Sequence, residues 1–417
     1  MSSNSPRHSL RYAWLVVALL GVVGALNYLD RMMITTMRKS IVEAMPMTDA
    51  QFGLLTSVFF WIYALLSPVA GFLADRFSRA RLIIGSLFVW SAVTWLTGHA
   101  RSYEELLLSR AFMGISEACY FPAALALIVD YHRGTTRSLA IGVHMAAIMV
   151  GQALGGFGGW SAERHSWSFP FSLLGGFGIA YAVVLLLLLR DPSASPADQR
   201  KAELGSRVRF LEALASLCAL PAYWTALCFW GLLGGIGGVV AVWMPTYFQE
   251  RFQLTQGTAG FSVTGWLYAA SFVGVLLGGV WADTWGRRRA RGRILVPAIG
   301  ACIAAPAILL LNTAEVLPVA IMGLVLYGTT RSFSDTNMMP ILCLIADPRY
   351  RATGYGVLNL FSCTAAGLGI YAGGALRDAR IPLNTIFLMV SGALACCALL
   401  LFSLRIPAKA AIEAESP

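Results

Sequence analysis

Apolar runs of about 20 residues recur along the whole chain, and no other feature constrains its fold as strongly. A helix of that length crosses the hydrocarbon core of a bilayer, which is roughly 30 Å thick. Of the 417 residues, 57% are hydrophobic and only 12% are charged, a composition that excludes a soluble globular protein. The sequence therefore predicts an all-α integral membrane protein with twelve transmembrane helices, at residues 13–37, 51–74, 82–100, 103–130, 138–160, 168–189, 222–248, 258–282, 294–312, 315–346, 353–376 and 382–404.

The basic residues are divided unevenly between alternate loops. The N-terminus, the even-numbered loops and the C-terminus hold 21 arginines and lysines, whereas the odd-numbered loops hold seven. Because basic loops stay in the cytoplasm, we expect both termini on that side. The first apolar run is too long for a cleavable signal. The chain has no Asn-x-Ser/Thr sequon, which favours a multi-pass protein of a bacterial inner membrane.

Three of the predicted spans carry an acidic and a basic residue: Asp30 with Arg31, Arg110 with Glu117, and Arg331 with Asp335. Each charge at membrane depth costs roughly 2.5–3.5 kcal/mol on insertion scales. Such residues either neutralise one another as structural pairs or mark the path of a polar substrate or ion. Three such spans in one chain favour the second interpretation. The sequence thus predicts a protein that moves something polar.

The two halves of the chain resemble each other. The segment GFLADRFSR (71–79) follows the second span, and GVWADTWGRR (279–288) follows the eighth. Two six-helix repeats of one topology, related by an axis along the membrane normal, form one large class of transporters. We therefore expect an N-terminal bundle at residues 1–190, a cytoplasmic linker at 191–221 and a C-terminal bundle at 222–417. An amphipathic piece of the linker, 208–217, is expected on the membrane surface.

The repeated segment resembles the G-x-L-A-D-R-x-G-R-R signature of the major facilitator superfamily, and the resemblance covers essentially the whole chain. The second copy has Thr284 where the family has a basic residue. The first departs from the family at Ser78 and Ala80. The resemblance implies a gate, in which the aspartate caps and pairs with arginines at helix ends and keeps the outward-facing state closed on the cytoplasmic side. It implies that role for seven residues, namely Gly71, Asp75, Arg76, Arg79, Gly279, Asp283 and Arg287.

Within the superfamily the chain resembles two branches. The anion:cation symporters, which carry sugar acids and other organic anions, resemble it at NYLDR (27–31), Tyr63, SRAFMGISEA (109–118), FPAA (121–124) and GVLN (356–359). The segment around Glu117 also looks like that of the spinster-type lipid transporters. The first branch implies proton-coupled symport of a small organic anion, a sugar acid above all. The alternative is a spinster-like, proton-coupled transporter of lysolipids or sphingolipids.

The resemblance to the first branch also implies roles for individual residues. Arg31 is expected to hold the substrate carboxylate. Asp30 and Glu117 are expected to carry the coupling protons, with Arg110 as the charge partner of Glu117. Hydrogen bonds to the substrate are expected from Tyr28, Tyr63, Gln152 and Asn359.

The residue types suit these tasks independently of any family. A guanidinium offers a planar fork that matches a carboxylate and keeps its charge, so Arg31 is a suitable anion receptor. Arg110 and Glu117 are seven residues apart on one helix, too far for direct contact in most rotamers. Arg110 can instead pair with Asp30, or reach Glu117 through water, and the sequence does not decide between them.

The tenth span holds a second candidate set. Arg331 and Asp335 are four residues apart and can pair locally on one helix face. Aligning Asp130 with Asp347 in the two halves places Ser334 opposite Glu117. Asp335 and Ser334 therefore lie near the C-terminal counterpart of the expected proton carrier, and Arg331 and Asp335 either bind substrate or only each other.

Other classes of function lack their motifs. The chain contains no His-Glu-x-x-His, no Gly-x-Ser-x-Gly and no Walker glycine loop, so an enzyme is not expected. The net charge of +10 arises from short loops between apolar spans, which argues against nucleic acid as a partner. We expect no cofactor and no metal, with the proton as coupling ion. The expected partners are the organic anion, protons and the lipid bilayer, and the expected state is a monomer.

Overall fold

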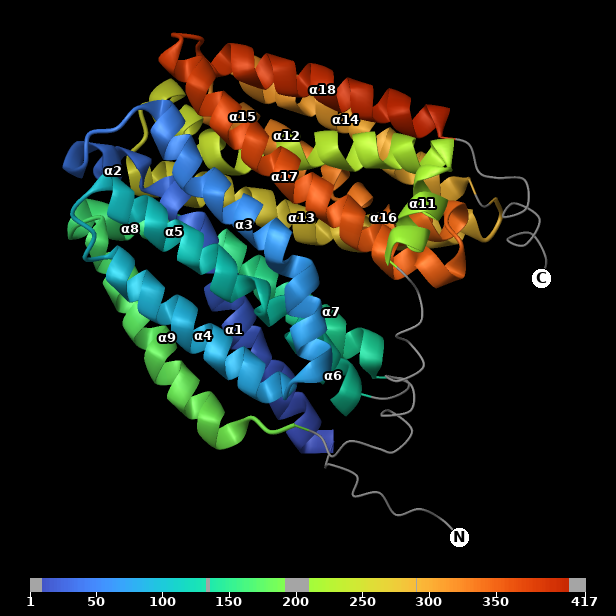
Figure 1. Ribbon diagram of the computed structural model, residues 1–417. Helices are drawn as coiled ribbons and strands as arrows, with labels where there is room; N and C mark the ends of the chain where they lie inside the picture. The colour runs from blue at the N-terminus through green and yellow to red at the C-terminus, as the bar shows by residue number, and fades with distance from the viewer. Residues whose placement is uncertain (1–9, 133–135, 192–209, 290, 405–417) are drawn as a thin grey trace.

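The computed structural model of the protein describes residues 10–132, 136–191, 210–289 and 291–404 (Figure 1). This part of the chain is helical and contains no strand. Eleven of its helices are long and apolar enough to cross a membrane. They form two bundles of helices, one from each half of the chain (Figure 1). The predicted all-α transmembrane fold is confirmed.

The N-terminal half contains the first six predicted spans: α1 (Leu10–Thr36), α2 (Arg38–Ala44), α3 (Asp49–Arg76), α4 (Arg79–Thr97), α5 (Tyr103–Ala118), α6 (Tyr120–Tyr131), α7 (Arg137–Ala153), α8 (Gly156–Arg164) and α9 (Ser168–Leu188). The fourth span is divided at Cys119 into α5 and α6. Pro122 accounts for this division, because a proline ring excludes the carbonyl four residues earlier, here that of Ala118. The fifth span is divided between α7 and α8.

The C-terminal half repeats this order: α11 (Phe210–Cys218), α12 (Pro221–Arg251), α13 (Gln256–Gly286), α14 (Gly292–Thr313), α15 (Leu317–Arg331), α16 (Phe333–Ile345), the 3-10 turn η1 (Pro348–Tyr350), α17 (Arg351–Asp378) and α18 (Leu383–Ser403). The predicted tenth span, 315–346, is two helices that meet at Ser332, directly after Arg331. The candidate spans Tyr103–Tyr131 and Arg137–Arg164 also combine two helices each, but the tenth span is not among the eleven. The expected surface helix is α11, and 192–209 of the expected linker lie outside the described residues.

Local sequence explains where several helices begin. Thr48 and Gln51 form a reciprocal capping box at the start of α3. The Ser102 side chain accepts a hydrogen bond from the backbone of Glu105 at the start of α5. Pro221 opens α12, where its missing N–H leaves no helical partner unsatisfied. These caps place the ends of the helices close to the predicted span boundaries.

The packing inside the two halves follows one pattern. In the N-terminal half α1 packs on α7, α4 on α9, and α3 on α5. The equivalent helices of the C-terminal half make the equivalent pairs, α12 on α17, α14 on α18, and α13 on α15. The repeat visible in the sequence is therefore a repeat of packing as well.

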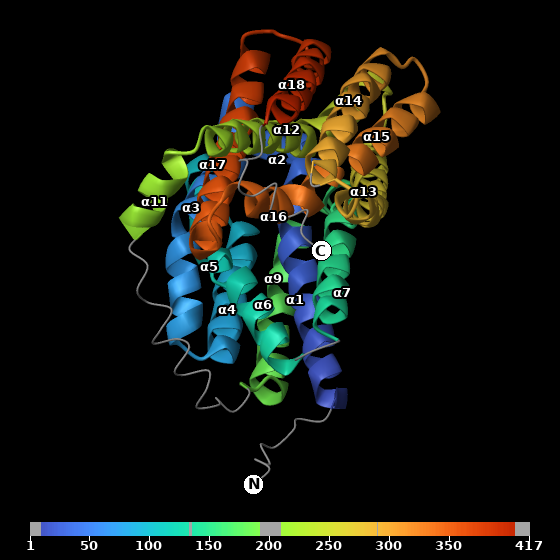
Figure 2. The same ribbon diagram turned by 90° about the vertical axis from the view of Figure 1, so that its right-hand side faces the viewer.

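The halves meet at one end of the molecule and diverge at the other (Figures 1 and 2). At the closed end α3 packs along α17, and α13 packs against α7 and α8. Two glycines permit the approach: a Cβ on Gly374 would lie 2.2 Å from the Asp49 carbonyl oxygen, and one on Gly156 would lie 2.4 Å from the Phe261 backbone nitrogen. Glycine thus allows backbone-to-backbone contact between the halves both where α3 meets α17 and where α8 meets α13.

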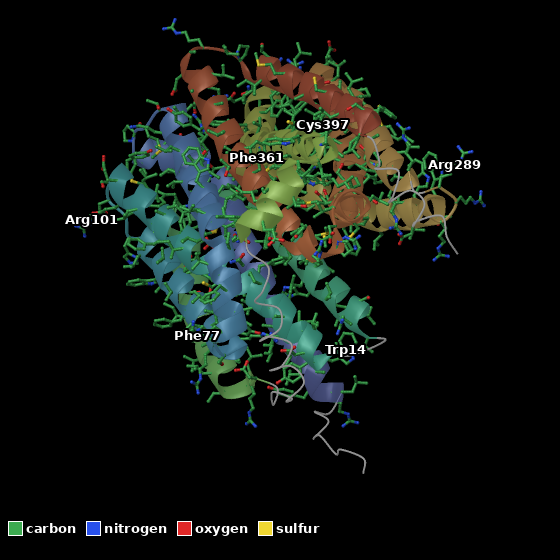
Figure 3. All side chains as sticks on the ribbon, turned by 45° about the vertical axis from the view of Figure 1, so that its right-hand side comes forward. Trp14, Phe77, Arg101, Arg289, Phe361 and Cys397 are labelled. Atoms are coloured by element: carbon green, nitrogen blue, oxygen red, sulfur yellow. The ribbon has the colours of Figure 1, made fainter. Side chains whose placement is uncertain are left out.

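The start of α1 and the end of α18 lie at the open end (Figure 1). Arg289, from an even-numbered loop, is at the open end of the C-terminal half, whereas Arg101, from an odd-numbered loop, is at the closed end (Figure 3). On the topology predicted from the basic residues, the open end faces the cytoplasm. The molecule is then inward-facing.

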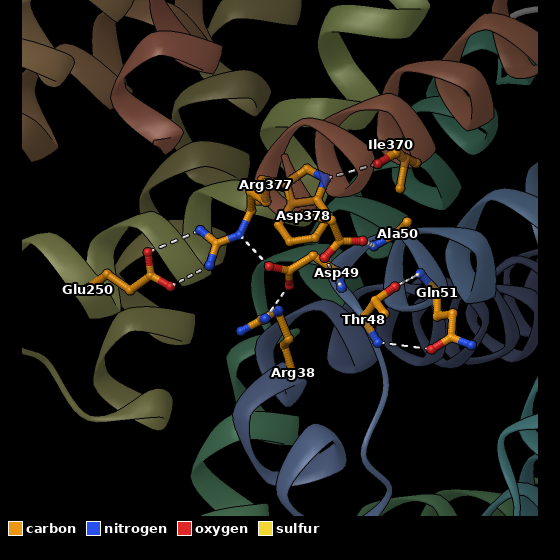
Figure 4. Close-up of polar contacts among 10 residues, drawn as sticks. Arg38, Thr48, Asp49, Ala50, Gln51, Glu250, Ile370, Arg377 and Asp378 are labelled. Carbon is orange, nitrogen blue, oxygen red and sulfur yellow. Dashed lines mark hydrogen bonds and ion pairs between the residues drawn. The ribbon is translucent and has the colours of Figure 1, made fainter. Parts of the chain in front are cut away.

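Ionic contacts join the halves at the closed end (Figure 4). Asp49, at the start of α3, pairs with Arg38 of its own half and accepts a hydrogen bond from Nε of Arg377 on α17 at 2.9 Å. The two terminal nitrogens of Arg377 donate to the carboxylate of Glu250, at 2.8 and 3.0 Å. Arg377 therefore connects acidic residues from both halves through one guanidinium.

Two further carboxylates cap helices of the opposite half. Asp378 accepts hydrogen bonds from the backbone N–H groups of Asp49 and Ala50, each at 2.9 Å, at the first turn of α3. Glu163, at the end of α8, accepts one from the N–H of Gly257 at 2.8 Å, at the first turn of α13. The two contacts occupy equivalent places in the two halves. Both put a negative charge where the helix dipole favours it.

We call the six residues whose side chains make these ionic and capping contacts at the closed end the outer clasp: Arg38, Asp49, Glu163, Glu250, Arg377 and Asp378.

Candidate functional site

A cavity of about 240 Å³ lies between the two halves, near the middle of the long helices. Its polar walls include two of the three intramembrane arginines, Arg31 from α1 and Arg331 from α15. The cavity is lined by Tyr28, Arg31, Met32, Phe60, Gln152, Gly234, Gly237, Gly238, Val240, Ala241, Leu267, Tyr268, Ser271, Tyr327, Arg331, Ser362, Cys363 and Ala366. Residues from both halves therefore meet in one space, as expected for a site that each half can uncover in turn.

Arg31 is held in the wall of this cavity by a carboxylate and by aromatic rings. Its Nε donates to Oε2 of Glu117 at 2.7 Å, and its side chain is only 7% exposed. The guanidinium carbon lies 4.6 Å from the ring centres of Tyr28 and Tyr63 and 4.8 Å from that of Phe59. Cation–π contacts of this kind stabilise a desolvated guanidinium. The aromatic rings thus help to offset the cost of a buried charge.

Glu117 is paired with Arg31, so the expectation that Arg110 is its charge partner is wrong. Glu117 and Arg110 are both fully buried. Within the described structure, Oε1 of Glu117 and two of the three guanidinium nitrogens of Arg110 have no hydrogen-bond partner. The third nitrogen of Arg110 contacts the sulfur of Met113 at 3.2 Å, and the guanidinium lies 5.3 Å from the Phe59 ring. The seven-residue spacing explains why Arg110 does not reach Glu117.

Asp30 lies outside the central cavity, although it is adjacent to Arg31 in sequence. It lines a small separate crevice inside the N-terminal bundle, with residues of α4 and α9. Its Oδ2 accepts a hydrogen bond from the hydroxyl of Thr94 at 2.5 Å. Oδ1 is buried and makes no hydrogen bond to the described side chains and backbone groups, and Arg110 is close enough to interact with this carboxylate electrostatically. Adjacent residues point about 100° apart on a helix, so Asp30 and Arg31 face different surroundings.

The expected hydrogen-bonding residues are divided between the cavity wall and its surroundings. Gln152, from the end of α7, lines the cavity together with Tyr28. Asn359 does not line it, but its carbonyl oxygen lies 4.0 Å from the sulfur of Cys363, which does. Tyr63 touches the site through the guanidinium of Arg31.

In the C-terminal half, Arg331 lines the cavity and forms an ion pair with Asp335. The two side chains pair at 2.9 Å and are 25% and 41% exposed, respectively. Ser334, the expected counterpart of Glu117, is buried in α16. Both α5 and α15 end close to a charged residue of the site, since α5 ends at Ala118, next to Glu117, and α15 ends at Arg331. Interrupted helices beside a central site are a recurring feature of transporters.

The two copies of the gate motif lie at the open end and make contacts within their own halves. Arg79 pairs with Asp130 of α6, and Asp283 lies 3.6 Å from Arg293 of α14. A Cβ on Gly71 or Gly279 would meet no atom within 4 Å.

Two other arginines of the motif occupy the ends of their helices. Arg76 is exposed and lies over Phe72, and Arg287 follows the last residue of α13. The side chain of Asp75 lies outside the described part of the structure.

Sequence reasoning missed the outer clasp and the tyrosines of the C-terminal wall. The hydroxyl of Tyr268 contacts the sulfur of Met32 across the cavity at 3.0 Å, and Tyr327 lines the same wall. Both lie in apolar spans where a tyrosine is not distinctive. A signal for the clasp was present, because Asp49, Glu250 and Asp378 stand at span ends on the side that is poor in basic residues.

Several proteins of known type are similar to this chain. Spinster homolog 3 of Danio rerio is 28% identical over 407 residues, which cover 90% of this chain and 79% of that protein. A sphingosine-1-phosphate transporter of Mus musculus is 30% identical over 246 residues, which cover 58% of this chain and 45% of that protein. An MFS-type efflux pump of Mycolicibacterium smegmatis is 24% identical over 385 residues, which cover 90% of this chain and 87% of that protein.

The fold agrees with a solved structure. A bacterial homolog of the human lysosomal transporter spinster, crystallised in an inward-facing and unoccupied conformation, superposes with a TM-score of 0.75. The superposition covers 98% of this chain and 97% of that one, at 23% identity. The sequence profile of the Major Facilitator Superfamily matches residues 20–370, most of the chain. The protein therefore belongs to the major facilitator superfamily and is a secondary transporter.

Proposed function

We propose that the protein transports a single-chain lipid with an anionic headgroup and couples this transport to protons. The observation that carries the proposal is the central cavity, in which the guanidinium of Arg31 faces apolar side chains such as Met32, Phe60 and Leu267. A headgroup can bind the guanidinium while the adjoining hydrocarbon lies on the apolar wall. The similarity to spinster proteins and to a sphingosine-1-phosphate transporter supports this substrate class over a sugar acid.

Coupling follows from competition for one arginine. Nε of Arg31 is occupied by Glu117, so an anion that binds the guanidinium side-on, through Nε and a terminal nitrogen, must displace that carboxylate. Glu117 is fully buried, and a buried carboxylate without its partner is destabilising by about 3–5 kcal/mol. Taking up a proton removes that cost. In this proposal the headgroup and the proton therefore bind together.

Access to the cavity is controlled by the two ends of the molecule. The outer clasp closes one end, while the gate motifs at the other end make ion pairs only within their own halves in the described structure. A rocking movement of the halves breaks the clasp and brings the gate motifs together. The loaded cavity would then open to the opposite side.

The test is a thermal-shift series with four ligands that separate headgroup from tail: sphingosine-1-phosphate, sphingosine, glycerol phosphate and glucuronate. A ligand that binds the native state raises the melting temperature as its concentration exceeds its dissociation constant. We expect sphingosine-1-phosphate to stabilise the protein and the other three to have little effect at equal concentration.

Two results decide against the proposal. Equal stabilisation by glucuronate would restore the sugar-acid interpretation, because a tail would then contribute nothing. Equal stabilisation by sphingosine would show that the anionic headgroup is not recognised. Repeating the series with Arg31→Lys assigns the effect to the cavity, since binding elsewhere on the protein would survive the substitution.

A further inference from the structure

We infer that Arg331 is a second headgroup-binding residue, and that the headgroup this cavity takes is a phosphate monoester held by one arginine from each half. The inference rests on the proposed function and specifies its substrate. Arg31 and Arg331 are contributed by α1 and α15, on opposite walls of the same cavity of about 240 Å³. A ligand between them would contact both halves at once.

The gap between the two guanidinium groups is bridged by tyrosines. Tyr28 lies under Arg31, with 4.6 Å between its ring centre and the guanidinium carbon. On the other wall Tyr268 is close enough to Arg331 and to Tyr28 to interact with both electrostatically. The hydroxyl of Tyr268 also reaches the sulfur of Met32, one residue from Arg31, at 3.0 Å. The two arginines are therefore separated by a short path of side chains that can donate hydrogen bonds to an oxyanion.

Arg331 has donors left for a ligand. One terminal nitrogen donates to Asp335 at 2.9 Å. Nε makes no hydrogen bond within the described residues, but it is buried, so the donor that faces a ligand is the other terminal nitrogen. The other terminal nitrogen lies against Gly237 of α12, where a Cβ would approach it to 3.3 Å. The missing side chain at Gly237 leaves the guanidinium room at the cavity wall.

The carboxylates paired with the two arginines, Glu117 and Asp335, differ in how far they are buried. Glu117 is fully buried, so it needs a proton when Arg31 turns to a ligand. Asp335 is 41% exposed, so when Arg331 turns away the aspartate charge is not enclosed by protein as that of Glu117 is. Tyr268, Tyr327 and Tyr355 are the other titratable groups close to Asp335. Arg331 can therefore add a positive charge to the site without a second proton.

A site with two available guanidinium groups favours a dianion. A phosphate monoester carries about −1.5 to −2 charges at pH 7 and presents three terminal oxygens. A phosphodiester carries one charge and presents two free oxygens, which one arginine can satisfy. Each charge-assisted bidentate contact contributes on the order of a ten- to hundredfold change in affinity. We expect the cavity to prefer the monoester by a factor of that size.

The alternative is that Arg331 and Asp335 only neutralise each other on the helix surface. Exposed pairs at this spacing contribute little to stability. A structural pair of this kind would not distinguish one lipid headgroup from another. Headgroup discrimination is therefore the property that separates the two interpretations.

The experiment measures the affinity of lysophosphatidate, a monoester, and of lysophosphatidylglycerol, a diester, with the same acyl chain. Purified full-length protein is compared with the double variant Arg331→Gln/Asp335→Asn, which removes the pair without leaving a lone charge. Arg288→Gln, at an exposed position outside the cavity, controls for the loss of one positive charge. We expect wild type and Arg288→Gln to bind the monoester roughly ten- to hundredfold more tightly than the diester. In the double variant the preference disappears, because monoester affinity falls and diester affinity stays.

Three outcomes overturn the inference. If the double variant keeps the preference for the monoester, or if wild type shows none, Arg331 does not bind the headgroup. If the double variant loses both ligands equally, the pair supports the structure of the site. If neither lipid binds wild type, the proposed function fails as well. The first and second outcomes leave the proposed function standing.

Discussion

In the proposed mechanism coupling depends on Glu117, because this carboxylate occupies Nε of Arg31 and is fully buried. We predict that Glu117→Gln abolishes proton-driven accumulation of substrate and retains exchange of substrate across the membrane. Glutamine keeps the size of the side chain and removes its titration. Exchange needs only reorientation with substrate bound. Both rates can be measured in proteoliposomes with and without a pH gradient.

The matched control is Glu43→Gln, an acidic position on α2 that is exposed and lies outside the cavity. It should accumulate substrate as wild type does. Accumulation by Glu117→Gln with a normal dependence on the pH gradient would rule out Glu117 as the coupling site.

Arg31→Lys tests the anion site itself. Lysine keeps the charge but loses the planar fork, so we predict a folded protein whose affinity for the lipid anion is roughly ten- to hundredfold lower. The three rings around the guanidinium add to this loss, because a compact ammonium is more strongly hydrated. Calorimetric titration measures the affinity, and circular dichroism checks the fold. Unchanged affinity would make Arg31 a structural charge.

At this scale the sequence predicted which residues lie together better than it predicted their partners. Arg31, Tyr28 and Gln152 were expected at a common site, and all three line the cavity. The predicted partner of Glu117 was Arg110, whereas the structure pairs Glu117 with Arg31. The hydrogen bond between Asp30 and Thr94 was not predicted. Partners depend on how helices are rotated about their axes and on which helices are neighbours. Residue spacing along one helix does not contain that information.

At the scale of helices, the outer clasp joins the two halves at the closed end. Arg377 joins Asp49 of α3 to Glu250 of α12, so Arg377→Gln removes contacts with both halves. We predict that this variant shifts the population toward the state that is open at the clasp end. Cys363 is a native reporter, since it lines the central cavity. An impermeant thiol reagent added outside intact cells should label Cys363 faster in the variant than in wild type.

Two variants make that labelling interpretable. Cys363→Ser in the Arg377→Gln background should lose the added signal, which identifies the labelled residue. Arg101→Gln removes an exposed arginine from the same end outside the clasp and should label at the wild-type rate. Equal labelling of Arg377→Gln and wild type would mean that the clasp does not hold this end closed.

Helix positions were predictable because burial in lipid requires long apolar runs, and eleven of the twelve expected spans appear as single candidate spans. The break in the tenth span could not be predicted, since no proline follows Ser332 closely as Pro122 follows Cys119. The clasp was beyond prediction as a unit because its residues come from α2, α3, α8, α12 and α17. Only the packing of the halves brings them together.

For the whole molecule, the basic bias of the loops predicts that the open end faces the cytoplasm. Cysteines introduced at Ser166 and at Arg289 test this, since both positions are exposed and they lie in an odd- and an even-numbered loop. In intact cells an impermeant reagent should label Ser166→Cys and spare Arg289→Cys. Lysing the cells should expose both. The reverse pattern would mean that the protein has the opposite orientation in the membrane, with the clasp end on the cytoplasmic side.

The repeat in the sequence was enough to predict two pseudo-symmetric halves, and the paired packing of α1 on α7 and α12 on α17 agrees with it. The sequence could not predict which end would be open. Alternating states of a transporter use the same helices and differ by a few kcal/mol, so both are compatible with one pattern of spans.

The central claim is that an anionic headgroup and a proton bind together, because the headgroup displaces Glu117 from Arg31. Its most direct test is the number of protons taken up on binding. Calorimetric titration with lysophosphatidylglycerol, in two buffers of different ionisation enthalpy, measures this number without interference from the ligand, whose phosphodiester does not titrate near neutral pH. We predict uptake of about one proton per ligand by wild type and none by Glu117→Gln, which should still bind. Binding by wild type without proton uptake, or equal uptake by Glu117→Gln, would contradict the account.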